Sequence, residues 1–195
     1  MKKIEIQGKR NQDKMKKMDD PNATIERKIQ LKRAKVISDD FYTSEQSLTL
    51  DILKRYIADL SIRIDGIQEY NDADNTSNDE VLNIILREID SKRKAYIYQD
   101  KQHSIYDHRY TVGTNRIVEL LVESEFVCHY CREICQVMYK EAMCRRQWTL
   151  DRIDNNYGHN DKNVVIACLE CNLKRGTMDS ERFRMGKQFT FRKLE

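Results

Sequence analysis

Chain-breaking residues are scarce in this sequence of 195 residues, which has one proline, Pro21, and six glycines. Proline and glycine build most of the tight turns between short strands, so their scarcity argues against an all-β fold and favours helices. Hydrophobic residues make up 39% of the chain and charged residues 34%. We therefore expect one or two domains with a modest core and a heavily charged surface.

Long apolar runs are also absent. No segment approaches the roughly 20 apolar residues that a membrane-spanning helix needs. The first residues, Met-Lys-Lys-Ile-Glu-Ile-Gln-Gly, lack the apolar run of a secretory signal peptide. We expect an intracellular protein with no membrane partner, in the cytoplasm or nucleus, of cellular, phage or viral origin. In such a reducing compartment clustered cysteines are metal ligands more often than disulfides.

Two Cys-x-x-Cys pairs stand out against this background. The first is Cys128 with Cys131, and the second is Cys168 with Cys171. Four thiolates grouped in this way can form a closed tetrahedral shell around one zinc ion, with Zn–S bonds of about 2.3 Å. We therefore predict a structural zinc that joins two distant segments. The other two cysteines, Cys135 and Cys144, are predicted to be ordinary thiols, with a second weak metal site as the alternative.

Positive charge is concentrated at the two ends of the sequence. The net charge is only +3, but the first 35 residues hold twelve Lys/Arg against five Asp/Glu. From Lys174 to the end there are seven Lys/Arg against three Asp/Glu. Two basic ends around a candidate site suit the phosphate backbone of a nucleic acid. A solvated tail is the alternative interpretation of residues 1–22.

Three regions follow from composition and periodicity. Residues 1–22 are polar, lysine-rich and without apolar period, which is typical of a disordered basic tail. Residues 23–125 have helical periodicity, and residues 126–195 hold the cysteine pairs and a basic C-terminal tail. The sequence therefore predicts an α+β fold, in which a mainly α-helical N-terminal region precedes a small zinc-stabilised domain.

Two helices dominate the predicted helical region. Thr43-Ser-Glu-Gln46 has the form of a capping box, and the helix that follows is expected to end near Tyr70. After a polar turn at residues 71–79, a second helix is expected to end near Tyr98 and to pack antiparallel to the first. Their apolar stripes, predicted to be core, are Leu53, Tyr56, Ile57, Leu60, Ile64 and Ile67, and Val81, Leu82, Ile85, Leu86 and Ile89. Shorter helical segments are expected at residues 23–38 and 115–124.

The C-terminal region has a characteristic order of elements. A strand over residues 149–154, a polar loop over 155–162 and a β-branched strand over 163–168 lie between the two cysteine pairs, and a helix follows the second pair. This order resembles that of the HNH endonucleases and, more distantly, the phage recombination endonuclease VII. The resemblance covers residues 126–178. It rests on Leu-Asp-Arg-Ile-Asp-Asn with Gly-His, on Asn-Val-Val, and on Cys-Leu-Glu-Cys-Asn.

The resemblance implies a treble-clef-like ββα-metal domain that hydrolyses phosphodiester bonds in DNA. It places Asp151 and Asn172 as ligands of a catalytic Mg²⁺ or Mn²⁺ ion, because such hard ions prefer oxygen ligands. Asn163 falls on the residue that braces the hairpin and orients the general base. Lys174 and Arg175 are expected in the first turns of the last helix, where they would contact a phosphate.

The general base is where the sequence departs from the family pattern. The family's histidine position holds Arg152, and a guanidinium cannot accept a proton at physiological pH. His159, in the loop between the strands, is the expected replacement. Asp154 and a metal-bound hydroxide are alternatives, and Arg152 would then bind the phosphate. Loss of hydrolysis is the remaining alternative.

Three functions follow, in order of preference. The first is a metal-dependent endonuclease acting on DNA, branched DNA included. The second is a zinc-stabilised nucleic-acid-binding module that does not cut. The third is a protein-interaction scaffold. A homodimer through the helical region would suit an enzyme that cuts both strands.

Overall fold

A computed structural model of the protein describes residues 46–64 and 76–189. Its elements are the helices α2 (Gln46–Ile64), α3 (Thr76–Gln102) and α4 (Thr114–Glu123), the strand β1 (Trp148–Arg152), the short 3₁₀ helix η2 (Asp161–Asn163), the strand β2 (Val164–Cys168), and the helices α5 (Leu169–Arg175) and α6 (Ser180–Gln188). Helices combined with one small sheet confirm the predicted α+β class. The expected tail at 1–22, the helix at 23–38 and Thr43 of the capping box lie outside the described residues.

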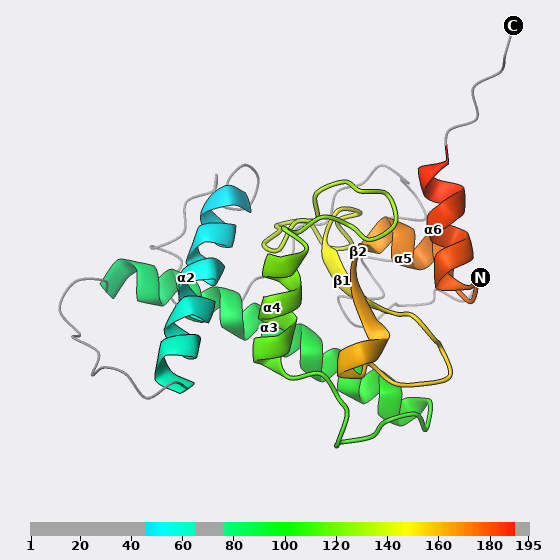
Figure 1. The fold of residues 1–195 in the computed structure, drawn as a ribbon, viewed down its shortest axis with the longest axis horizontal. Helices are drawn as coiled ribbons and strands as arrows, with labels where there is room; N and C mark the ends of the chain where they lie inside the picture. The colour runs from blue at the N-terminus through cyan, green and yellow to red at the C-terminus, as the bar shows by residue number, and fades with distance from the viewer. Residues whose placement is uncertain (1–45, 65–75, 190–195) are drawn as a thin grey trace, which may run out of the picture.

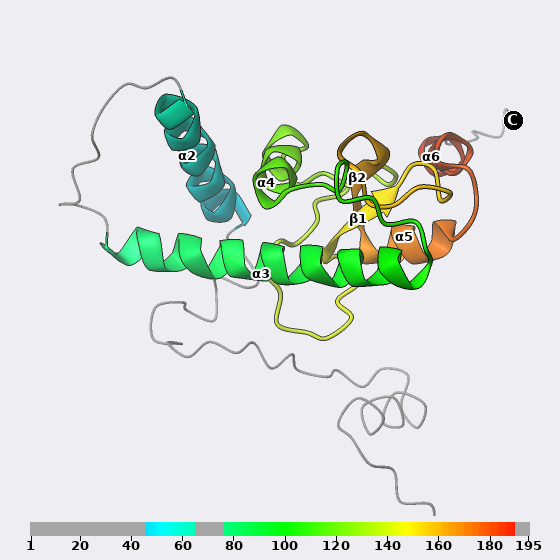
Figure 2. The ribbon, with the colours of Figure 1, turned by 90° about the horizontal axis from the view of Figure 1, so that it is seen from below.

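The elements are arranged along α3. Figure 2 shows α3 as a long rod, with α2 at one end, α4 beside its middle and the β1–β2 hairpin towards its C-terminal end. One hydrophobic core runs from the helices into the cysteine-rich part of the chain. Its fully buried members include Leu53, Ile85, Ile89, Ile117, Val118, Leu121, Phe126, Trp148 and Leu150. The expected apolar stripes of the two long helices thus supply part of one continuous core.

The prediction that α2 and α3 form an antiparallel hairpin is wrong. The two helices cross steeply and separate along their lengths (Figures 1 and 2). Helix α4 packs against both of them, and its Ile117, Val118 and Leu121 are completely buried. The apolar stripes of α2 and α3 therefore pack on a third helix in addition to each other, which a pairwise interpretation of two stripes does not foresee.

The bounds of α3 also differ from the expected ones. The helix begins at Thr76, inside the segment expected to be a turn, and extends four residues beyond Tyr98 to Gln102. The extension includes Asp100, which is only 1% exposed. Tertiary contacts of this buried carboxylate, described below, hold the last turn in helical form where local composition gives no signal.

The small sheet is an antiparallel pair in which Trp148 lies opposite Cys168 and Arg152 opposite Val164. Side chains of α3 cover the free edge of β1. Lys92 donates a hydrogen bond to the carbonyl of Trp148, and the Tyr96 hydroxyl accepts one from the backbone N–H of Leu150 at 3.1 Å. Residues four apart on a helix share one face, so Lys92 and Tyr96 reach successive outward-facing groups of the strand. This arrangement satisfies an edge that would otherwise be open to pairing.

Helix α6 was not expected, because the C-terminal end of the chain was predicted to be a basic tail. Asp179 caps its N-terminus by accepting a hydrogen bond from the N–H of Arg182 at 2.8 Å. At its other end Gln188 donates to the carbonyls of His129 and Tyr130, both at 3.0 Å. The helix is thus held against the first cysteine pair, beside α5 (Figure 1).

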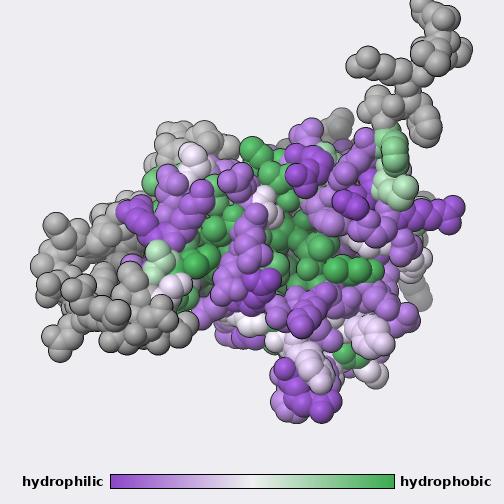
Figure 3. All heavy atoms as spheres, in the orientation of Figure 1, coloured by the Kyte–Doolittle hydropathy of each residue, from purple (hydrophilic) through white to green (hydrophobic). Residues whose placement is uncertain are grey.

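The face of the molecule that Figure 3 shows is largely hydrophilic around a central apolar area. Figure 3 shows apolar atoms on both sides of α4, towards α2 and towards β2. A hollow of about 480 Å³ lies between α4 and β2 and is lined in part by Leu120, Val122 and Val165. In the part of the chain that the structure describes, no helix has both the length and the apolar character needed to cross a bilayer.

The hydrogen bond between Tyr96 and β1 gives a test of this arrangement. Replacing Tyr96 by Phe leaves the buried N–H of Leu150 without an acceptor, so we expect the free energy of unfolding to fall by about 1–3 kcal/mol. Tyr98→Phe is the matched control, since Tyr98 lies on the same helix and is 66% exposed. Urea denaturation followed by circular dichroism measures both. Equal stability of the two variants would contradict the proposed edge contact.

Candidate zinc centre and the two faces of strand β1

The first cysteine pair lies in a tight hairpin. The N–H of Cys128 donates to the carbonyl of Glu133 at 2.9 Å, and the N–H of Arg132 donates to the carbonyl of Cys128 at 3.1 Å. Arg132 has a φ of 62°, in the left-handed region that closes such turns. The hairpin turns the side chains of Cys128 and Cys131 towards the same point.

The second pair lies where β2 passes into α5. Cys168 is the last residue of the strand and the N-cap of the helix. Its sulfur accepts a hydrogen bond from the N–H of Cys171 at 3.5 Å, which satisfies one of the free donors at the helix start. The first turn of α5 therefore directs Cys171 back towards Cys168.

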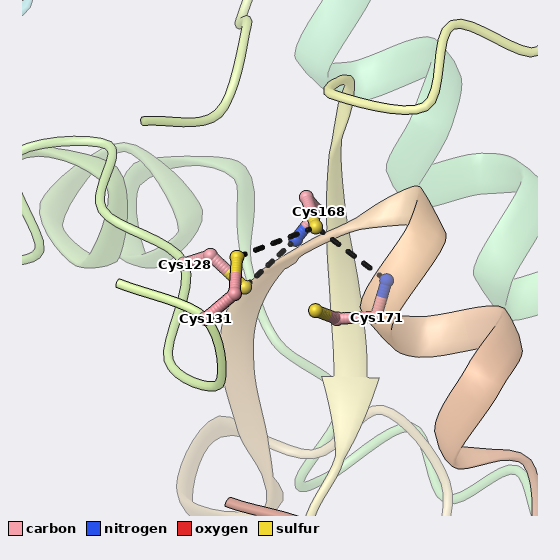
Figure 4. Close-up of side chains that lie close together, drawn as sticks. All are labelled: Cys128, Cys131, Cys168 and Cys171. Atoms are coloured by element: carbon pink, nitrogen blue, oxygen red, sulfur yellow. Dashed lines mark hydrogen bonds between the residues drawn. The ribbon is translucent and has the colours of Figure 1, made fainter. Parts of the chain in front are cut away.

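All four sulfurs converge, as Figure 4 shows for Cys128, Cys131, Cys168 and Cys171. Their ligand atoms lie within 4.8 Å of one another, and Cys131 Sγ is 3.9 Å from Cys168 Sγ. Tetrahedral zinc with Zn–S bonds of about 2.3 Å requires sulfurs about 3.8 Å apart. The donor set and its spacing thus fit one closed metal site, and the predicted grouping of these four cysteines is confirmed.

Hydrogen-bond donors surround the cluster. The N–H of Cys168 donates to Cys128 Sγ at 3.3 Å, and Arg146 Nη1 donates to Cys131 Sγ at 3.7 Å. Such donors stabilise the negative charge that four thiolates bring to a zinc ion, and they orient the ligands. Zinc bound here has no open position for a substrate, so its role would be structural.

The remaining two cysteines stay outside the group. Cys135 is buried beside Cys128, and a hydrogen bond to that sulfur, followed by burial, raises the pKa of the Cys135 thiol. Cys144 donates to Gln136 Oε1 at 3.0 Å. Within residues 46–64 and 76–189, no second group of histidine, cysteine and acidic side chains converges on a metal position.

Strand β1 divides the other predicted site residues between its two faces. Alternate residues of a strand point in opposite directions. Asp151 accordingly faces α5, whereas Arg152 faces the C-terminal end of α3. The residues that the HNH resemblance gathers into one site thus face two sides of β1, although the charge of Asp151 still acts on His159.

On the α5 face, Asp151 is buried, and both of its carboxylate oxygens accept hydrogen bonds. Arg175 donates to both carboxylate oxygens, from Nε at 2.7 Å and from Nη2 at 3.0 Å. The hydroxyl of Tyr130 donates to the same carboxylate, and burial together with this bond raises the pKa of Tyr130. Asp151 thus accepts three hydrogen bonds, two at Oδ2 and one at Oδ1, and these bonds hold α5 on β1.

Arg175 and Lys174 lie in the last turn of α5, so the expectation that they occupy the first turns is wrong. The helix has only seven residues, since it ends where Gly176 adopts a φ of 54°. Arg175 is 3% exposed, and beyond Asp151 it donates to the carbonyls of Arg152 and Met178. This burial removes Arg175 from contact with a nucleic acid. Lys174 is exposed and pairs with Glu170.

The side chains of Asn172 and Asn163 hold neighbouring segments together through hydrogen bonds. Asn172 Nδ2 donates to Thr149 Oγ1 at 3.1 Å and to the carbonyl of Leu150 at 3.4 Å, so its amide fastens α5 to β1. Asn163 Oδ1 accepts from the N–H of Asp154 at 2.9 Å, and its Nδ2 donates to the carbonyl of Gly158 at 3.0 Å. The geometry of Asn163 is that of a residue that fixes the hairpin loop.

On the α3 face, His159 forms a buried pair with Asp100. One carboxylate oxygen of Asp100 accepts from the backbone N–H of His159 at 2.7 Å, and the other lies 2.8 Å from His159 Nδ1. The Tyr96 ring lies 4.5 Å from the imidazole, between centroids. Burial lowers the pKa of His159 below its usual value, against the opposing effect of Asp100. A neutral imidazole that donates from Nδ1 has Nε2 as its proton acceptor.

The chain makes room for this pair at Gly158. A Cβ at this position would lie 2.8 Å from Asp100 Oδ2 and 2.7 Å from the carbonyl oxygen of Ile105. Arg152 completes the cluster, with Nη1 3.8 Å from Asp100 Oδ1 and a weak bond of 3.4 Å to the carbonyl of Tyr157. Asp154, the alternative base, is exposed and accepts hydrogen bonds from Asn156 within the loop.

Asp100 is the residue that sequence reasoning missed. The apolar stripes of the helical region were predicted to be core, and the expected helix ended before this residue. A signal was present, because Lys92, Tyr96 and Asp100 recur at steps of four. Such a polar row on a helix with an apolar stripe indicates contact with polar partners, but it does not name them.

Comparisons of the chain with protein families, with curated proteins and with solved structures find no match. The resemblance to the HNH endonucleases therefore stays a prediction from the motifs and from the order of elements around the four cysteines.

The zinc site gives a direct prediction. Protein purified without chelators is expected to contain one zinc ion per chain by elemental analysis, and Cys128→Ser is expected to lose the ion together with cooperative thermal unfolding. Cys144→Ser is the matched control, because its sulfur lies outside the group of four. Retention of zinc by Cys128→Ser, or absence of zinc from the unmodified chain, would contradict the assignment.

The ion pair of Asp151 and Arg175 gives a second prediction, on stability. Asp151→Ala leaves a buried guanidinium unpaired, so we expect the free energy of unfolding to fall by about 3–5 kcal/mol. The double variant Asp151→Leu/Arg175→Met removes both charges and should recover much of that loss. Glu170→Ala serves as the control, since it breaks the exposed pair with Lys174. Urea denaturation of the four proteins tests the pair. An equal effect of Asp151→Ala and Glu170→Ala would refute it.

Proposed function

We propose that the chain binds nucleic acid through a basic surface around the four-cysteine site, and that it does not cut nucleic acid by the magnesium-dependent route that the HNH resemblance implies. The single observation that carries the second half of this proposal is the engagement of both Asp151 oxygens by Arg175. The cations around the cysteine site support the first half.

The basic surface consists of Arg132, Arg145, Lys174, Arg184 and Lys187. The pKa of Glu170 is lowered by three nearby cations, which are Lys174, Arg145 and Lys187. The pKa of His129 is lowered by burial and by the nearby cations Arg184 and Arg132. Helix α6 connects the two groups, because Arg184 and Lys187 lie one turn apart on it. Arg132, Arg145 and Lys187 form no salt bridge with any residue in the described ranges, which leaves their charge available to phosphates.

The hydrogen bonds of Asp151 and Asn172 favour nucleic-acid binding over hydrolysis of the phosphodiester. Hydrolysis of a phosphodiester by the HNH route needs hard oxygen ligands that hold a divalent ion at the scissile phosphate. The carboxylate of Asp151 accepts three hydrogen bonds from Arg175 and Tyr130, and Asn172 uses its amide nitrogen to fasten α5. A cation brought to Asp151 would have to displace a buried guanidinium, at a cost of several kcal/mol.

DNA cleavage is the second candidate function, and the pair of Asp100 and His159 favours it. Asp100 lies 2.8 Å from Nδ1, and in the tautomer that donates from Nδ1 the acceptor for a proton is Nε2. Arg152 lies beside the same carboxylate, where it could also reach a phosphate oxygen. In this candidate His159 is the base, and Asp100 sets its tautomer.

Binding is tested by the salt dependence of affinity for labelled DNA and RNA. Replacing Arg145 and Lys187 by Gln should weaken binding, and the slope of log affinity against log salt should fall by about 0.9 for each phosphate that is no longer neutralised. Lys54→Gln, an exposed change on α2, is the control and should leave the slope unchanged. Failure of the unmodified chain to bind any nucleic acid at low salt would reject the proposal and favour the interaction scaffold.

Cleavage is tested in the same samples by incubation with Mg²⁺ or Mn²⁺ and linear, branched or single-stranded DNA. We expect binding without cleavage. Cleavage that disappears in both Asp100→Asn and His159→Gln would establish the second candidate instead. Dimerisation through the helical region stays a prediction, for which light scattering on the eluted protein is the measurement.

A further inference from the structure

A second hollow lies on the hairpin loop, and neither the zinc centre nor the basic surface uses it. It has a volume of about 860 Å³ and lies between the loop after β1 and the segment that leads into α4. Backbone hydrogen bonds join these two segments. The N–H of Asp161 donates to the carbonyl of Tyr110 at 3.0 Å, and the N–H of Val112 donates to the carbonyl of His159 at 3.0 Å. The volume is in the range of about 300–1,000 Å³ that is typical of small-ligand pockets.

Two exposed aromatic rings line this hollow. Tyr110 is 58% exposed and Tyr157 is 60% exposed, and they come from the two opposite sides of the paired segments. The guanidinium of Arg109 lies 5.3 Å from the centre of the Tyr110 ring. Large aromatic faces left open beside a hollow are suited to stacking against a planar ligand.

The charges around the hollow are largely neutralised. Arg116 forms salt bridges with Glu119, Glu123 and Asp161, at 2.8, 2.8 and 2.9 Å. Arg109 pairs with Asp107 at 2.8 Å. The hollow therefore suits an uncharged group better than a phosphate. Lys162 and Asp154 are the exceptions, since both line the hollow, are exposed and have no salt bridge to any described residue.

Amide groups complete the lining. Asn115, Asn160 and Asn163 all contribute to the hollow. The side-chain oxygen of Asn160 is buried and has no hydrogen-bond partner, which is an uncommon state for a polar atom in a folded protein. An amide oxygen without a partner supplies an acceptor for a ligand that has a donor on its edge.

We infer that this hollow binds an unpaired nucleobase of a single strand or of a bulge. A base is flat, neutral and aromatic, and its edge carries the donors and acceptors that amides recognise. Tyr110 and Tyr157 stack on it, Asn160 contacts its edge, and Lys162 lies at the rim for the adjoining phosphate. The inference rests on the proposed binding of nucleic acid and names the form of nucleic acid that the chain prefers.

The experiment compares three labelled ligands of one sequence: a duplex, the same duplex with one unpaired nucleotide, and the single strand. The full chain with its zinc should bind the two ligands that have unpaired bases about tenfold more tightly than the duplex. Tyr110→Ala and Tyr157→Ala should each weaken binding of those two ligands by roughly 5- to 100-fold, and leave duplex binding unchanged. Tyr110→Phe, which keeps the ring face, should retain most of the preference.

Tyr98→Ala is the matched control, because Tyr98 is 66% exposed but lies on α3, away from the hollow. The salt slope provides a second readout, since the tyrosine changes should leave it unaltered whereas replacement of Arg145 and Lys187 lowers it. A fluorescent adenine analogue at the unpaired position should be quenched by the unmodified chain and less so by the tyrosine variants.

Equal affinity for the three ligands, or an equal loss of affinity for all three in the tyrosine variants, would overturn the nucleobase site and leave the basic surface in place. Failure of all three ligands to bind the unmodified chain would overturn the proposed function, and the nucleobase site with it.

Discussion

Convergence of four sulfurs is the constraint on which the C-terminal half of the structure depends. The pair at Cys128 and Cys131 is separated by about forty residues of chain from the pair at Cys168 and Cys171, yet all ligand atoms lie within 4.8 Å. This convergence fixes one hairpin to the point where β2 becomes α5. The small sheet has only two strands and cannot be stable alone, so its position depends on this closure and on the helices packed around it.

Strand β1 is where the two halves of the chain meet. Helix α5 covers one face through Arg175 and Asn172, and α3 covers the edge and the other side through Lys92, Tyr96 and Asp100. Each of these contacts satisfies a polar group that would otherwise be buried without a partner. The consequence for function is that residues adjacent in sequence, Asp151 and Arg152, belong to different clusters. One cluster is a structural ion pair, whereas the other places His159 Nδ1 2.8 Å from the carboxylate of Asp100.

Local patterns predicted the elements well and their partners poorly. Periodicity identified α2, α3 and α4, and β-branched composition identified β2, because these signals depend on neighbours within a few residues. The short basic helix α6 gave no comparable signal, and it is held by Gln188 on the backbone of the first cysteine pair. The crossing of α2 over α3 is accompanied by α4, which packs against both helices. Asp100 lay beyond the expected helix end, so its pairing with His159, which requires Gly158 beside it, was not foreseen.

The sequence by itself determined the metal donors, since two Cys-x-x-Cys pairs limit the chemistry to a soft, closed tetrahedral site. It also determined the hairpin between them and the helical character of the rest. Only the tertiary structure decided which basic side chain each buried carboxylate pairs with. Asp151 and Asp100 are both acidic residues in the sequence, but the first is directed into Arg175 and the second into His159. The physical reason is that a side chain's charge is local, whereas its partner depends on which faces of distant elements are buried together.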